Sequence, residues 1–323
     1  MRLTQPRVVA HADWSISADK RWLTVAECAV GGRYHVHAPV PVGDPGDLPR
    51  HLSERAKLNP VLLGVDFPLG LPIAYARSAG VEAFAPWLDE AGTGNWSNFF
   101  ELCESVEDIS LERPFYPRRP GGTSHTQLVD ALGASSIDDL RRRCERKTDR
   151  RGAAAPLFWT LGAQQVGRAA ISGWRDMLQP ARRGRDVVVR LWPFEGSLGE
   201  LLHRKTIVVA ETYPAESAVQ IGIGAPGRRW SKRRQSDRAA HAHALTEWAR
   251  DRRVTLDEAL YPLVRDGFGD LAHGEDQFDS LIGLAGMLDV VLGVRPEMPP
   301  MSNERRIVEG WILGQAGGNR QSR

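Results

Sequence analysis

The sequence predicts a single mixed α/β domain that carries a large insertion. Short apolar runs, typical of buried strands, alternate with amphipathic segments that are typical of helices. A long central stretch, residues 73–185, interrupts this alternation with helical segments and loops rich in Pro, Gly and Arg. We therefore expect one α/β core of ordinary size for 323 residues, with the stretch inserted into it and not folded as a second domain.

The first half of the core is predicted to contain four strands and a helix. Residues 6–12 form an apolar run typical of a buried strand. Residues 21–30 and 33–40 alternate apolar and polar side chains, as half-buried antiparallel strands do, and a Gly-Gly pair between them indicates a hairpin. A short helix near 47–58 and an apolar strand at 61–65 follow. The predicted order is three strands, a helix and a fourth strand.

The second half of the core is predicted to follow the insertion. Residues 186–194 look extended, and 206–211 form the fifth core strand. Helices are expected from about 214, over 235–252, and over 275–293, where apolar residues recur at three- and four-residue spacing. Residues 1–315 are thus one domain, with the insertion between the fourth and fifth core strands, and we expect a disordered tail at 316–323.

Composition is typical of a globular protein. Hydrophobic residues make up 42% of the chain and charged residues 25%. No run approaches the ~18 to 20 apolar residues of a membrane span, and no secretory signal pattern is present at the start. The three cysteines, Cys28, Cys103 and Cys144, are widely spaced and form no CxxC pair, which favours a reducing compartment. We therefore expect a cytoplasmic location and no membrane partner.

Charge is distributed unevenly along the chain. The net charge is −6 over residues 1–140, +12 over 141–238 and −4 over 239–323. A basic middle in an otherwise acidic chain favours a polyanionic partner such as nucleic acid or a nucleotide. An Arg-rich surface without any such partner is the alternative.

Acidic residues stand at the ends of the apolar runs. They are Asp13, Asp66 and Glu211 after three predicted strands, and Asp276 with Asp279 at the start of the last helix. A carboxylate at the edge of a buried strand is costly unless a cation pairs with it. Acids gathered from distant parts of a sequence are typical ligands of Mg²⁺ or Mn²⁺, and we expect one or two such ions.

Each acid also has a simpler structural role open to it. Asp13 and Asp66 can satisfy turns, Glu211 can pair with a nearby Arg, and Asp276 can cap its helix. Asp279 is the hardest to account for without a cation, because it faces the apolar side of its helix.

Basic residues gather in a loop over 228–238. Lys232, Arg234 and Arg238 are the candidate phosphate contacts, although a solvated surface loop has a similar composition. A second basic cluster, over 141–147, is better interpreted as a charged helix face. His11 is interpreted as a core histidine, with a general-base role for His273 as a weaker hypothesis.

The segments HADWS, GVDFPLGLP, AETYPAES, SKRRQ and EDQFDSLIGL, in this order, resemble the DUF429 family of predicted RNase H-like nucleases. The resemblance covers about residues 6–293 and implies a five-stranded mixed sheet of order 3-2-1-4-5 with helices on both faces. It also implies that acids from the first strand, the fourth strand and a late helix meet at one sheet edge. Those acids match Asp13, Asp66 and Asp279, and Glu211 matches a glutamate of the family; Lys232 and Arg238 also fall at matching positions.

Three functions fit these residues. The first is a metal-dependent phosphodiester hydrolase, a nuclease acting on DNA or RNA. The second is a phosphotransferase or ATPase of the actin-like or sugar-kinase type, which is weaker because the glycine-rich turns after the strands are missing. The third is a non-catalytic nucleic-acid-binding protein, which has no need for four nearly buried carboxylates.

Overall fold

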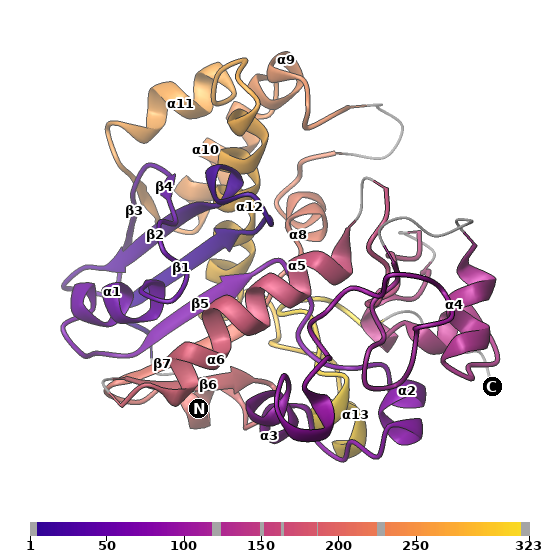
Figure 1. Cartoon of the computed structure of the whole chain (residues 1–323). Coiled ribbons are helices and arrows are strands. Elements are labelled where there is room, and N and C mark those ends of the chain that lie inside the picture. Colours follow the sequence, from indigo (N-terminus) through magenta and orange to yellow (C-terminus); the bar gives the residue numbers. More distant parts are fainter. Residues whose placement is uncertain are drawn as a thin grey trace.

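The protein is a mixed α/β structure, seen here in a computed structural model (Figure 1). The structure describes residues 5–117, 124–148, 152–162, 165–185, 187–224 and 230–317. Most of the tail predicted at 316–323, and the start of the basic loop at 228–229, lie outside these residues.

Eight strands are present in the described part of the chain, more than the five predicted. They are β1 (Val8–Asp13), β2 (Trp22–Cys28), β3 (Tyr34–Val36), β4 (Val40–Pro41), β5 (Val61–Val65), β6 (Val188–Trp192), β7 (Thr206–Glu211) and β8 (Thr255–Leu256). The expected strand at 33–40 is divided into β3 and β4, and the two-residue β8 is too short to give a periodic signal.

One mixed sheet contains all eight strands, in the order β6-β7-β5-β1-β2-β3-β8, with β4 also paired to β2. The strands expected to form the core lie within it as β3-β2-β1-β5-β7, and β6, β4 and β8 extend it. β1 runs parallel to β5, β5 to β7 and β7 to β6, whereas β2 is antiparallel to β1 and to β3. The carboxyl ends of β1, β5 and β7 therefore meet at one edge.

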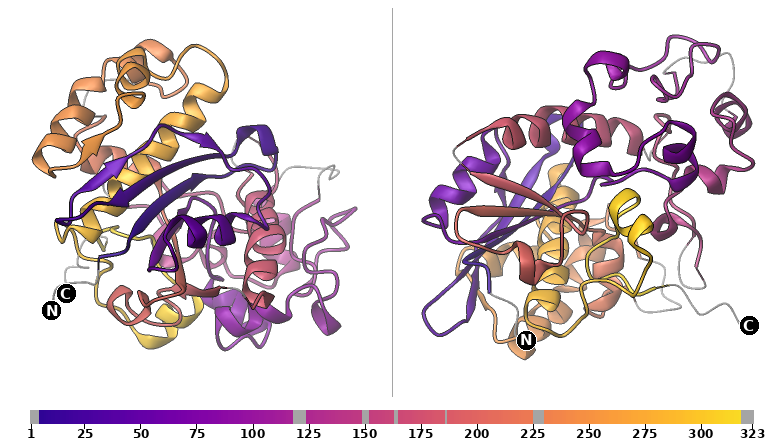
Figure 2. Two further views of the ribbon diagram at one scale, coloured as in Figure 1. Left: turned by 90° about the vertical axis from the view of Figure 1, so that its left-hand side faces the viewer. Right: turned by 90° about the horizontal axis from the view of Figure 1, so that it is seen from below.

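Helices cover both faces of this sheet (Figure 2). The helices are α1 (Leu48–Arg55), α2 (Ile73–Ser78), α3 (Phe84–Glu90), α4 (His125–Ala131), α5 (Val166–Ser172), α6 (Gln179–Arg183), α7 (Leu198–Leu201), α8 (Pro214–Gln220), α9 (Gln235–Ala239), α10 (Ala242–Asp251), α11 (Leu260–Asp266), α12 (His273–Val291) and α13 (Asn303–Val308). Short 3₁₀ turns lie at Ala18–Lys20, Gly94–Trp96, Ile137–Leu140 and Arg143–Glu145, and a π-helical stretch, Gly173–Leu178, joins α5 to α6.

Two buried clusters make up the core. On one face, helices α1, α5 and α6 pack with side chains such as Val8, Leu63 and Val209 of the strands. On the other face, helices α8, α10 and α12 pack against Val9, Leu62 and the other strand residues whose side chains point to that face. Since side chains alternate across a strand, the position of a residue in its strand decides which of these two layers it enters.

The described residues of the predicted insertion share the buried core of the sheet. Its aromatic side chains, among them Phe84, Phe99 and Trp174, belong to the same buried cluster as the residues of β1 and β5. The predicted helix over 235–252 is two helices, α9 and α10, separated at Ala240 and His241. The expected last helix is α12, which is buried along almost its whole length and packs on β1, β2 and α8.

Candidate metal and phosphate site

Parallel pairing places Asp13 and Asp66 side by side. Ala12 of β1 pairs with Val65 of β5, so the next residue of each strand emerges at the same edge and on the same sheet face. The Asp66 carboxylate accepts a hydrogen bond of 2.7 Å from the Trp14 backbone N–H. A side-chain hydrogen bond also joins Asp66 to Asp13, which is only 7% exposed. Two carboxyl groups in such contact share a proton or require a cation.

Helix α12 brings two further aspartates to the same edge. Asp276 and Asp279 lie three residues apart, one turn of the helix, and so share a face. Asp279 is 7% exposed and close enough to Asp13 to raise its pKa. Asp276 is partly exposed, but its Oδ2 atom is buried and has no hydrogen-bond partner among the described residues. This orphaned oxygen is a free ligand atom within the group.

Burial and mutual repulsion perturb all four carboxyl groups. Burial raises the pKa of Asp13 well above its usual range, and the neighbouring carboxylates of Asp66, Asp279 and Asp276 raise it further. The pKa of Asp66 is raised to about 7, mainly by burial, with the Trp14 hydrogen bond opposing the rise. Burial, followed by the charge of Glu275, raises the pKa of Asp276 to about 6. The group carries more negative charge than its surroundings compensate.

Lys232 is the cation of this group. Its ammonium donates to Asp279 Oδ2 and lies 3.4 Å from Glu275 Oε1, and its side chain is 45% exposed. Burial raises the pKa of Asp279, and this lysine opposes the rise. Lys232 is thus the cation in direct contact with these acids, and it remains accessible from solvent. The charges of Arg238 and Lys20 also lower the pKa values of Asp279 and Asp276, respectively.

The other two predicted phosphate contacts have different roles. Arg238 is 2% exposed, and its guanidinium donates to the backbone carbonyls of Lys232, Gly267 and Gly269 at 2.5–2.7 Å. It holds the segment that carries Lys232 and is a positioning residue. Arg234 is exposed and pairs with Asp237 at 2.7 Å. Of the three predicted contacts, Lys232 alone touches the aspartate group.

Glu211 lies on the opposite face of the sheet. It pairs with Val65 in the sheet, one position before the edge reached by Asp66, so its side chain points into the other layer. There its two oxygens accept hydrogen bonds of 2.5 and 2.6 Å from Arg142, and Oε2 accepts another of 2.7 Å from Leu69 N–H. Both oxygens are therefore occupied. Glu211 is thus held by Arg142 in this structure, although it lines the same hollow as Asp66. Its predicted role as a metal ligand stays a prediction.

Arg142 is a buried core residue that the sequence does not single out. The cluster at 141–147 has the composition of a charged helix face, but Arg142 is fully buried and also bonds Glu145 at 2.7 Å. No periodic pattern distinguishes it from Arg141 or Arg143, because its partner Glu211 is distant in sequence. The i, i+3 spacing to Glu145 is the only local signal.

Two hollows adjoin the aspartates. One, of about 640 Å³, lies between the strand ends and helix α5, and its lining includes Trp14, Lys20, Asp66 and Arg168. The other, of about 380 Å³, lies between α8 and α12 and is mostly apolar, with Trp230 and Phe278 in its wall and Lys232 and Asp279 at its edge. A ligand in either hollow reaches a carboxylate of the site.

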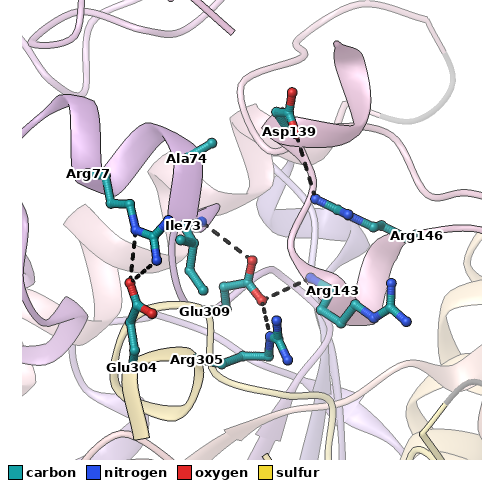
Figure 3. Close-up of a pocket in the computed structure, with 9 residues that line it drawn as sticks. All are labelled: Ile73, Ala74, Arg77, Asp139, Arg143, Arg146, Glu304, Arg305 and Glu309. Carbon is teal, nitrogen blue, oxygen red and sulfur yellow. Dashed lines mark hydrogen bonds and ion pairs between the residues drawn. The ribbon is translucent and has the colours of Figure 1, made fainter. Parts of the chain in front are cut away.

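A third hollow, of about 520 Å³, is basic but separate from the aspartates (Figure 3). Figure 3 shows Arg77 paired with Glu304 and Arg305 paired with Glu309. The N–O distances of these two ion pairs are 2.7 and 3.2 Å. Glu309 also accepts from the backbone N–H of Arg143 at 3.1 Å. Acids thus neutralise much of the positive charge in this hollow, which weakens the case for a polyanion there.

Of the two histidines interpreted from the sequence, His11 lies in the core as predicted, and the general-base role of His273 stays a hypothesis. His11 is fully buried, hydrogen-bonds Thr212 Oγ1 at 2.7 Å, and has its pKa lowered to about 3 by burial. It is a neutral core histidine beneath the aspartates. His273 stacks on Trp22 with a ring separation of 5.3 Å.

The donor atoms fit a hard divalent cation in type and charge. Carboxylate oxygens are what Mg²⁺ and Mn²⁺ prefer, and the group has an excess of negative charge. Within the described residues, however, the aspartates are not a set whose ligand atoms all lie within 4.8 Å of one another. With Lys232 bonded to Asp279, metal binding requires the carboxylates to converge further.

Comparison of the chain with protein-family models, curated proteins and solved structures finds no match. The resemblance to the DUF429 family therefore stays a prediction. Across the described residues, no helix has the length and apolar character of a membrane span.

Proposed function

We propose that the protein is a metal-dependent phosphodiester hydrolase with an RNase H-like fold, acting on nucleic acid or a nucleotide. The observation that carries the proposal is the meeting of Asp13, Asp66 and Asp279, from β1, β5 and α12, at one sheet edge. Burial first, and then the neighbouring carboxylates, raise their pKa values, so the ionised form is costly, and a divalent cation would offset that cost. The neighbouring order β3-β2-β1-β5-β7 also supports the fold that the resemblance implies.

Each residue of the site has a distinct role in this proposal. Asp13, Asp66 and Asp279 hold the ion, and Asp276 offers its unpartnered oxygen as a further ligand. The Trp14 backbone N–H fixes one oxygen of Asp66 and so orients the other. Bound Mg²⁺ or Mn²⁺ compensates the charge on the phosphate and on the attacking and leaving oxygens.

Lys232 has a role toward the phosphate in this proposal. Its ammonium bonds Asp279 in this structure, and an ion held by Asp279 would leave the exposed ammonium to contact a phosphate oxygen. The apolar hollow beside it, walled by Trp230 and Phe278, accepts a nucleobase, since bases stack on aromatic rings.

The test is cleavage of labelled single-stranded DNA, duplex DNA and RNA, and of a small aryl phosphodiester, in Mg²⁺ or Mn²⁺. Asp13→Asn is expected to reduce metal-dependent cleavage by about 10³-fold or more, because it removes a ligand charge while keeping the side-chain shape. Asp19→Asn, at an exposed acid six residues away, is the matched control and keeps full activity.

Cleavage that survives in Asp13→Asn, or in EDTA, contradicts the proposal. ATP binding with phosphate transfer would favour the phosphotransferase hypothesis instead. Metal-independent binding of nucleic acid without turnover would favour the non-catalytic hypothesis.

A further inference from the structure

A second group of potential ligands lies at the far side of the sheet, on β3 and β8. His35 and His37 are two residues apart, so both side chains point to the same sheet face, opposite to the buried side chains of Tyr34 and Val36. The segment YHVH carries this alternation, which is the sequence signal for the pair.

Strand β8 brings an acid to the two histidines. It runs parallel to β3, with His35 opposite Thr255 and Val36 opposite Leu256, so His37 comes opposite Asp257. The Asp257 backbone N–H donates to Val36 O at 2.9 Å, which holds Asp257 at this register. More than 200 residues separate the acid from the histidines, so only the folded sheet reveals the group.

The distances between the polar atoms are close to those of a coordination sphere. Asp257 Oδ2 lies 3.3 Å from His37 Nδ1 and 4.0 Å from His35 Nε2, and the three ligand atoms all lie within 4.8 Å of one another. No other group of three His, Cys, Asp or Glu residues is gathered this closely in the described ranges. Ligand atoms around a tetrahedral metal, with bonds of about 2.0–2.2 Å, are roughly 3.3–3.6 Å apart. Small side-chain rotations bring the group to that geometry.

Glu27 completes the surroundings of His37. Its Oε1 lies 3.6 Å from His37 Nε2, a buried atom without a hydrogen-bond partner among the described residues. Metal-bound histidines commonly donate their second ring N–H to a carboxylate, which fixes the tautomer and the ring orientation. Arg55 Nε holds Glu27 in place at 2.6 Å. Glu27 is therefore placed to orient His37 while Nδ1 faces the metal position.

We infer that His35, His37 and Asp257 form a binding site for a divalent transition metal, separate from the aspartate group. Two imidazoles and one carboxylate favour Zn²⁺, Co²⁺ or Ni²⁺ over Mg²⁺, which prefers oxygen ligands. The side chains are 41%, 32% and 35% exposed, so an ion reaches them from solvent and water completes its coordination. A bound ion links the two-residue strand β8 to β3 and so fastens the region of α10 and α11 to the sheet.

The test is titration of metal-stripped full-length protein with Co²⁺, followed by absorption, and with Zn²⁺, followed by calorimetry and thermal melting. Wild type is expected to bind one Zn²⁺ at this site and to melt at a higher temperature when it is bound. Asp257→Asn is expected to weaken Zn²⁺ binding by about 100-fold, and Glu27→Gln by about 10-fold, because each removes a charge while keeping the side-chain shape.

A control variant shows whether the ion binds at this site or elsewhere on the protein. His203→Ala removes an exposed histidine elsewhere and leaves Zn²⁺ binding unchanged. The double variant His35→Ala with His37→Ala, checked for folding by circular dichroism, loses the Co²⁺ absorption. Unchanged Zn²⁺ binding in Asp257→Asn and in the double variant, or no binding by wild type beyond nonspecific surface association, overturns the inference.

Discussion

Two groups of buried carboxylates lie on opposite faces of the same sheet edge. Asp13, Asp66 and Asp279 gather on the α12 side with a single lysine, whereas Glu211 and Glu145 surround Arg142 on the other side. In the second group every oxygen of Glu211 has a donor and the guanidinium is fully enclosed. Burial raises the pKa of Glu211 too, and Arg142 opposes that rise. In the first group, burial raises the pKa values of Asp13 and Asp66, and neighbouring carboxylates raise them further.

The difference shows what distinguishes a structural carboxylate from a candidate metal ligand. Both groups are buried and both include residues at strand ends, so burial alone does not separate them. Hydrogen bonding does, since a bidentate arginine gives each oxygen of Glu211 a donor, whereas Asp276 Oδ2 has no partner among the described residues. The predictions that follow test this contrast, beginning with the largest effect.

Arg142→Met tests the compensated side. The change leaves Glu211 and Glu145 buried without their cation and is expected to cost roughly 3–5 kcal/mol of unfolding free energy. Denaturation in urea measures it. Arg143→Met is the control, because the neighbouring side chain is exposed, and it should change stability by less than about 0.5 kcal/mol. Equal effects of the two changes would mean that Arg142 is not the counter-ion of the core.

Asp66→Asn tests the uncompensated side in metal-free protein. The folded-state pKa of about 7 is above the ordinary value of 3.8, so the folded state binds more protons and wild-type stability falls as pH rises from about 4 to 7. The asparagine cannot ionise and still accepts the Trp14 hydrogen bond. We expect Asp66→Asn to be more stable than wild type by about 1–2 kcal/mol at pH 8, and equal to it near pH 4.

The control for this prediction is Asp19→Asn, whose stability should follow that of wild type at every pH. Chemical unfolding at pH 4, 6 and 8 in EDTA gives the comparison. A variant that is less stable than wild type at pH 8 would show that ionised Asp66 is already compensated.

Lys232→Met tests whether the lysine and a metal compete for Asp279. Removing the ammonium takes away both its bond to Asp279 and its repulsion of an incoming cation. Mn²⁺ is expected to bind about tenfold more tightly at pH 8, equivalent to about 1.4 kcal/mol, as measured by calorimetry at low salt. Arg234→Met, which removes an exposed cation paired with Asp237, leaves the affinity nearly unchanged. Weaker binding in Lys232→Met would show that the lysine assists the ion.

The sequence predicts part of the aspartate site, because that part depends on local patterns. Asp13 and Asp66 each follow an apolar run, and Asp276 and Asp279 share a turn of a segment whose apolar residues recur at three- and four-residue spacing. The strands and the long helix that carry them form where these patterns predict. The sequence does not predict on which face of the sheet the Glu211 side chain lies. That face depends on the register of β7 against β5, in which Glu211 pairs with Val65 and not with Asp66.

Apolar periodicity and the acids at the ends of apolar runs are thus sufficient to predict a mixed α/β protein and the aspartates of its edge. Tertiary structure alone decides which carboxylates are compensated, since Arg142 reaches Glu211 across 69 residues of chain. It also decides that Asp257 joins His35 and His37, through a strand of two residues. The partner of each charged side chain is set by the packing of segments that are distant in sequence. A pattern within one segment therefore does not predict it.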